Sequence, residues 1–177
     1  MSQIITINVG GAGVNIGKAA LQFSAEEHGI GFDGYLKGDE SARRSQEDIN
    51  HDVIFRENSA GMWTPRSVFF DLQSEQIESL LSDPVGELVE TGQYLSANRA
   101  SSGVYSDGSE LAGPALEIFR REAEQCDLVK DVLLYNATAG GTGSGLTSKV
   151  SKGIYQNDPK TSIVQYCILP ETQGDPR

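Results

Sequence analysis

Basic residues, cysteines and long apolar runs are all scarce in this sequence of 177 residues. Its 14 lysines and arginines stand against 25 acidic residues, which gives a formal net charge of −11. Nucleic acids and anionic membranes repel such a chain, so we expect neither among its partners. No apolar run approaches the length of a membrane span, and no basic and apolar leader begins the chain. These absences predict a soluble, cytoplasmic protein.

Two cysteines, Cys126 and Cys167, are too few and too far apart for a disulfide framework or a zinc motif. We expect both to be buried free thiols, with Cys126 on the inner side of a helix. A chain of this length buries a full core without such cross-links. The 38% hydrophobic and 22% charged content is typical of a globular protein, so we expect residues 1–177 to form one domain.

Glycine, by contrast, is abundant, and its densest cluster is Ala-Gly-Gly-Thr-Gly-Ser-Gly at residues 139–145. The cluster follows an apolar run at 132–135 and precedes a helical pattern at 146–152. A strand, a glycine turn and a helix in this order form a phosphate cradle, because glycine lets backbone N–H groups approach an anion. A flexible glycine hinge is the alternative interpretation.

The spacing of this cluster differs from that of a P-loop. Gly140, Gly145 and Thr147 match three positions of G-x-x-x-x-G-K-[ST], but Leu146 stands where that motif requires lysine. The sequence therefore predicts that backbone amides and a cation hold the phosphates, without a lysine.

A second glycine cluster, residues 10–17, follows the β-branched run 4–9. The pattern predicts a helix that continues to about His28 and stops at Gly29. Its expected inner side consists of Ile16, Ala19, Ala20 and Phe23.

The same cluster matches a relaxed dinucleotide-binding fingerprint at Gly11, Gly13 and Gly17. It misses the strict spacing by one residue, and no acidic residue ends a second strand about twenty residues later. A dinucleotide-dependent oxidoreductase therefore remains only a third hypothesis.

The remaining pattern alternates strands with helices. It predicts strands at 66–70, 131–135 and 162–169, helices at 74–81 and 111–126, a loop at 37–58 and an irregular stretch from 82 to 103. The second helix is expected to pack through Leu116, Phe119, Ala123 and Cys126. This order predicts an α/β, Rossmann-like three-layer domain with a mainly parallel sheet and helices on both faces.

Asp71 follows the predicted strand 66–70. In a parallel sheet it would stand at the edge that carries the glycine loops, where it is placed to hold a metal ion through water. A capping or turn aspartate is an equally common role for this position.

Around these motifs the chain resembles the amino-terminal nucleotide-binding domain of tubulin, the alpha subunit more than the beta. Residues 140–145 reproduce the core of the tubulin signature, and 9–17, 27–30 and 65–72 resemble the first nucleotide loop, the segment after its helix, and the acidic loop. The resemblance implies GTP or GDP as ligand, with Ala100 near the γ-phosphate and Glu171 or Asp175 near the ribose. The implied nucleotide contacts are Gly10, Gly11, Ala12, Asn15, Gln73, Ala100, Ala137, Gly140, Gly141, Thr142 and Gly143.

Several positions depart from the tubulin pattern. Gly11 replaces a glutamine, Gln73 an acidic residue beside magnesium, Ala137 a serine, and Ala139 the first glycine of the longer signature. Each change removes a polar contact, a negative charge or a loop glycine, which predicts weakened Mg²⁺ binding.

The resemblance also implies which partners the chain has and whether it hydrolyses GTP. Tubulin subunits or the microtubule lattice are the expected partners, and the cytoskeleton the expected location. The second and carboxy-terminal tubulin domains, with the residue that activates water, have no counterpart here, so we expect no GTP hydrolysis by this chain alone. The alternative is a pseudo-tubulin that has lost its nucleotide and serves as a structural interaction domain in a larger assembly.

Overall fold

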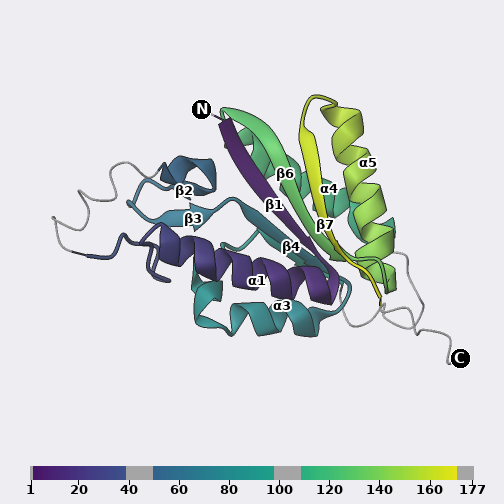
Figure 1. The fold of residues 1–177 in the computed structure, drawn as a ribbon, viewed down its shortest axis with the longest axis horizontal. Helices are drawn as coiled ribbons and strands as arrows, with labels where there is room; N and C mark the ends of the chain where they lie inside the picture. The colour runs from purple at the N-terminus through teal and green to yellow at the C-terminus, as the bar shows by residue number, and fades with distance from the viewer. Residues whose placement is uncertain (1, 39–49, 98–108, 171–177) are drawn as a thin grey trace, which may run out of the picture.

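The computed structural model describes residues 2–38, 50–97 and 109–170, and it is built on a parallel five-stranded sheet (Figure 1). The strands run in the order β5-β4-β1-β6-β7, and every neighbouring pair is parallel. Their bounds are Ser2–Val9 (β1), Ser67–Asp71 (β4), Tyr94–Ser96 (β5), Leu128–Ala137 (β6) and Ser162–Ile168 (β7). The predicted α/β fold is confirmed.

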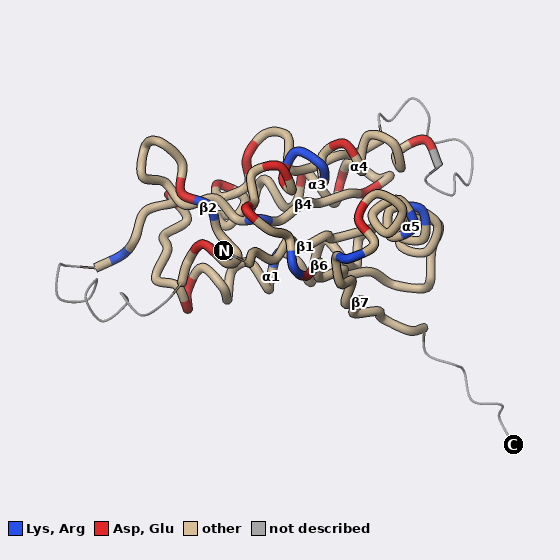
Figure 2. The backbone as a smooth tube through the Cα atoms, turned by 90° about the horizontal axis from the view of Figure 1, so that it is seen from above, with Lys and Arg blue, Asp and Glu red and all other residues tan. Residues whose placement is uncertain are grey.

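Helices cover both faces of this sheet. Gly10–Glu27 (α1) and Ser74–Leu81 (α3) pack on one face, together with the short 3-10 helix Pro84–Leu88 (η2). Ser109–Glu124 (α4) and Thr147–Asn157 (α5) pack on the other. Figure 2 marks the lysines and arginines in blue. Two of them, Lys149 and Lys152, lie on α5. No helix within the described ranges is long and apolar enough to cross a bilayer.

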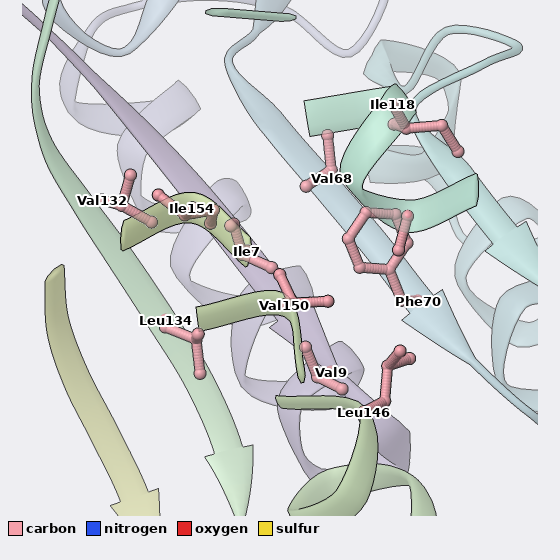
Figure 3. Close-up of a cluster of buried hydrophobic side chains, with 11 residues drawn as sticks. Ile7, Val9, Val68, Phe70, Ile118, Val132, Leu134, Leu146, Val150 and Ile154 are labelled. Carbon is pink, nitrogen blue, oxygen red and sulfur yellow. The ribbon is translucent and has the colours of Figure 1, made fainter. Parts of the chain in front are cut away.

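The alternation of strand side chains divides the interior into two cores. In β4, Val68 and Phe70 enter the cluster beneath α4 and α5, whereas Phe69 enters the cluster beneath α1 and α3. Figure 3 shows the first cluster, in which Ile7 and Leu134 of the central strands meet α5. Each sheet face therefore requires a helical layer, as a parallel sheet does.

Helix α1 presents a different face to the sheet from the predicted one. Phe23, expected inside, is 67% exposed, and Ala19 is exposed as well. The buried face instead carries Gly13, Val14, Gly17, Leu21 and Ala25. A β-carbon on Gly13 would overlap the carbonyl of Tyr135, and one on Gly17 would overlap the side chain of Asn8. The sheet-facing stripe thus contains glycines, which a search for large apolar residues does not count.

The predicted stop of α1 is confirmed, because Gly29 adopts a φ of +63° directly after the helix cap His28. The other predicted helices agree with the structure or need small corrections. Helix α3 has the predicted bounds. Helix α4 begins and ends two residues earlier than expected, and its most buried side chains are Ala115, Ile118 and Glu122. Cys126 therefore follows the helix, and both cysteines are free and half-buried instead of buried.

Three short strands were absent from the sequence-based prediction. Phe55–Glu57 (β2) and Trp63–Pro65 (β3) form an antiparallel pair, preceded by the 3-10 turn His51–Val53 (η1), and β5 lies in the stretch predicted to be irregular. Strands of three residues are too short to show a two-residue period, so long-range pairing alone defines them. Residues 39–49 of the predicted loop lie outside the described part of the chain.

The two histidines of the protein meet where α1 ends against η1. Nδ1 of His28 lies 3.0 Å from Nδ1 of His51, and the rings pack against Phe55 and Trp63, respectively. Burial lowers the pKa of both imidazoles. The charge of His51 lowers the pKa of His28 further, while Glu27 opposes the shift at His28 and Asp52 opposes it at His51.

This pair predicts a pH-dependent stability. Because both pKa values are lower in the folded state, the unfolded chain binds more protons as the pH falls through the ordinary value of 6.5. We expect the free energy of unfolding to fall between pH 7.5 and 5.5, and to fall less in the double variant His28→Gln, His51→Gln. Urea unfolding at each pH measures both slopes. Equal slopes would show that the pair does not control the effect.

Candidate functional site

A pocket of about 230 Å³ opens at the carboxyl ends of the central strands. Strand β1 leads into α1 on one face of the sheet, and β6 leads into α5 on the other, so the loops diverge between these two strands (Figure 1). Parallel α/β sheets bind ligands at such a switch point. The pocket is lined by Val9, Gly10, Gly11, Ala12, Asp71, Gln73, Ala137, Ala139, Gly140, Gly141, Thr142 and Gly143.

Most of the residues proposed from the sequence lie around this pocket. One of them does not line it, and one cannot be placed. Asn15 is exposed one turn further along α1, and Ala100 lies outside the described residues, as do Glu171 and Asp175. Val9 and Ala139 line the pocket without having been predicted as contacts. The structure therefore brings both glycine clusters and the acidic loop to one place.

The walls of the pocket consist mainly of backbone. Gly10 has a φ of +75° and Gly140 a φ of +92°, both in the region that favours glycine. The two clusters also touch, since a β-carbon on Gly10 would lie 3.1 Å from the amide nitrogen of Gly143. A β-carbon on Gly143 would lie 2.6 Å from the carbonyl oxygen of Ala137. Small residues are thus required here for close contact between loops.

Asn136 fixes the glycine loop to the sheet, and the sequence analysis did not identify this role. Its buried Nδ2 donates to the carbonyl of Gly143 at 2.8 Å and to that of Ala137 at 3.2 Å. Its Oδ1 accepts from Nε2 of Gln165 on β7 at 2.8 Å. A buried asparagine near the end of a strand, shortly before a glycine cluster, was the available signal.

The pocket offers backbone N–H groups to an anion and has no basic side chain in its described lining. Helix α1 begins at Gly10, and a single π-helical turn, Thr142–Leu146 (η4), leads into α5. Neither α1 nor η4 carries an acidic residue in its first turn, so both helix starts present unneutralised N–H groups. The described lining contains no lysine, arginine or histidine. An anion would therefore be held by backbone amides.

Asp71 is the single carboxylate in the described lining, and its side chain is almost fully buried. Oδ1 accepts from the amide of Gln73 at 3.0 Å, which is the turn role expected as the alternative. Oδ2 is buried and makes no well-formed hydrogen bond among the described residues, although the Thr142 side chain lies close enough to the carboxylate to affect its pKa. Burial raises the pKa of Asp71, while backbone hydrogen bonds from Gln73 and Leu72 and the Thr142 side chain oppose the shift. An unpartnered carboxylate oxygen is suited to a hydrated cation.

Two other hollows lack this combination of features. A narrow cavity of about 90 Å³ separates α1 from the sheet beside Asn8 and Gly17, and its lining is mainly apolar. A polar cleft of about 490 Å³ includes Arg66 and Asp127. The guanidinium of Arg66 already donates to the backbone carbonyls of Asp52 and Gln125. These hydrogen bonds hold neighbouring segments together, which is a structural role.

Comparison with known proteins gives one consistent result. The model of the Tubulin/FtsZ family, GTPase domain, matches residues 3–176. The tubulin alpha-1 chain of Saccharomyces cerevisiae is 33% identical over 98% of this chain and 40% of its own length. The tubulin beta chain of the same yeast is 31% identical over 96% of this chain and 37% of its own length. Alpha and beta chains are thus matched at a similar level, and the chain spans about two fifths of these relatives.

Proposed function

Since this chain belongs to the Tubulin/FtsZ family, we propose that its pocket binds a guanine nucleotide, GTP or GDP, through the phosphates. The observation that carries the proposal is the meeting of two glycine loops and two helix starts around one cavity that also contains the orphaned oxygen of Asp71. Backbone amides recognise phosphate without a lysine, which agrees with Leu146 in place of the P-loop lysine.

The further roles are proposals from the same family membership. We propose tubulin subunits or the microtubule lattice as partners and the cytoskeleton of the cytoplasm as the location. We also propose binding without hydrolysis by this chain alone, because the described lining offers Asp71 as its single titratable group, and that carboxylate is placed for a cation. Among the described lining residues, no second group is positioned as a base for water.

The purified protein allows a direct test. The protein is denatured, and the released nucleotide is separated by chromatography. Stoichiometric GTP or GDP would support the proposal. An empty protein that also fails to take up added GDP, yet co-sediments with microtubules, would replace it with the structural alternative. Released NAD or FAD would support the oxidoreductase hypothesis instead.

The structural alternative is favoured by one observation. Gly11, Gln73 and Ala137 line the pocket where tubulins carry side chains that contact the nucleotide or its metal, and two of the three have no polar side-chain group. A pseudo-tubulin would keep the glycine loops for the close packing of Gly10 against Gly143 alone.

Asp71 would hold Mg²⁺ through water if the ion accompanies the nucleotide, and the ion would neutralise phosphate charge. Replacement by asparagine removes the buried charge and keeps the shape of the turn. We expect Asp71→Asn to abolish the Mg²⁺-dependent part of nucleotide affinity while it leaves the apo protein as stable, or more stable by about 1 kcal/mol. Nucleotide titrations with Mg²⁺ and with EDTA, alongside urea unfolding, measure both effects. An unchanged Mg²⁺ dependence would exclude Asp71 as the metal residue.

A further inference from the structure

Gln165 of strand β7 is connected to the pocket by hydrogen bonds that pass through Asn136. Nε2 of Gln165 donates to Oδ1 of Asn136 at 2.8 Å. Nδ2 of Asn136 in turn donates to the carbonyl oxygens of Gly143 and Ala137, at 2.8 and 3.2 Å. Both acceptors belong to residues that line the pocket, whereas Gln165 does not line it. The hydrogen bonds therefore extend from the last strand of the described sheet to the pocket wall.

The register between β6 and β7 brings these two side chains together. Leu134 lies opposite Gln165, and Asn136 lies opposite Cys167. Because strand side chains alternate between faces, Gln165 and Asn136 lie on the same face of the sheet as Leu134, which packs in the core beneath α4 and α5. A shift of one residue in this register would turn Gln165 to the opposite face and break the connection.

Asn136 can hold the glycine loop in only one orientation of its carboxamide. Its nitrogen must face the two carbonyl oxygens, because its own oxygen would repel them. Oδ1 then faces Gln165, whose Nε2 supplies the donor that this oxygen requires. Asn136 is only 2% exposed, so a reversed carboxamide would set oxygen against oxygen where little water can intervene. The donor on β7 therefore supports the orientation that binds the loop.

We infer that Gln165 is a positioning residue for nucleotide binding, which fixes the orientation of Asn136 and, through it, the pocket wall at Gly143 and Ala137. This inference rests on the proposed function. It gives β7, which contributes no residue to the described lining, a part in shaping the phosphate site. Gln165 is exposed, so its side chain can be replaced without a change to the apolar core.

Three substitutions of Gln165 separate hydrogen bonding from packing. Gln165→Met keeps the length of the side chain and removes the donor, and we expect about fivefold weaker binding of a fluorescent GDP analogue, the effect of one hydrogen bond. Gln165→Glu offers only acceptors, which draw the nitrogen of Asn136 away from Gly143, so we expect a loss of about 20-fold. Gln165→Lys restores a donor, and we expect affinity within about twofold of that of the unaltered protein.

Two matched controls account for the added charges. Val164 is the preceding residue of β7, its side chain is 40% exposed, and it lies on the opposite face of the strand. Val164→Glu and Val164→Lys place the same charges at this neighbouring position, and we expect both to bind the GDP analogue normally. Equal losses in Val164→Glu and Gln165→Glu would attribute the effect to charge and overturn the assignment.

Amide hydrogen exchange in the nucleotide-free protein tests the glycine loop directly. We expect the amides of residues 140–145 to exchange about fivefold faster in Gln165→Met, because the loss of one hydrogen bond makes local opening easier. Gln165→Lys should return the exchange to its original rate. A side chain that only packed on the strand would leave these rates unchanged in all three variants.

The outcomes distinguish this assignment from the proposed function. Normal binding by Gln165→Met, unchanged exchange in the loop, or equal losses with Gln165→Met and Gln165→Lys would each overturn the assignment while the proposed function stands. If the unaltered protein binds no GDP analogue, the proposed function fails and the assignment fails with it. Thermal unfolding of each variant shows whether it is folded.

Discussion

Gly143→Val is expected to abolish nucleotide retention. Gly143 is buried in η4, and even a single β-carbon there would lie 2.6 Å from the carbonyl oxygen of Ala137. A valine must push the glycine loop away from the end of β6 and weaken its hydrogen bond from Asn136. Because several backbone amides lose their positions together, we expect affinity for GDP to fall on the order of 100-fold or more.

Ser148→Val is the matched control for this experiment. Ser148 is exposed on α5, five residues further along the chain, so the same side chain should leave binding unchanged there. Near-ultraviolet circular dichroism and thermal unfolding establish that both variants are folded. A folded Gly143→Val protein that binds GDP normally would show that the phosphates lie elsewhere.

Gly13→Ala is expected to cause the largest loss of stability. Its β-carbon would overlap the carbonyl of Tyr135, which belongs to the backbone of β6 and has no rotamer with which to move aside. Helix α1 must then separate from the sheet along the stripe that carries Val14, Leu21 and Ala25. We expect the free energy of unfolding to fall by about 3 kcal/mol or more, measured by urea denaturation.

Gly11→Ala, two residues earlier in the same helix, serves as the comparison. A β-carbon there would make an ordinary contact of 3.4 Å with the flexible side chain of Gln76. Alanine also favours the helix over glycine, so we expect unchanged stability or a gain of up to about 1 kcal/mol. Similar losses in both variants would mean that helix propensity, and not the approach of α1 to the sheet, sets the effect.

The pocket residues could be predicted because their requirements are local. A run such as Gly140 to Gly143 after a buried strand has few other uses, and parallel strands bring their carboxyl ends to one edge. The same reasoning applied to Asp71 at the end of β4. The glycines at 13 and 17, however, suggested a dinucleotide fingerprint, and the structure shows them packed against β6 and β1. A glycine pattern does not distinguish contact with a ligand from contact with a strand.

The amino-acid sequence by itself therefore determined the α/β class, the strands with short apolar or β-branched runs and the set of glycines at the sheet edge, because strand period and glycine conformation are properties of short segments. The tertiary structure decided which face of α1 is buried, where β5 pairs, that Asn136 holds the glycine loop, and that Gln76 lies opposite Gly11. These features depend on contacts between segments that are distant in the chain. The packing that stabilises these contacts cannot be inferred from the residue pattern of one short segment.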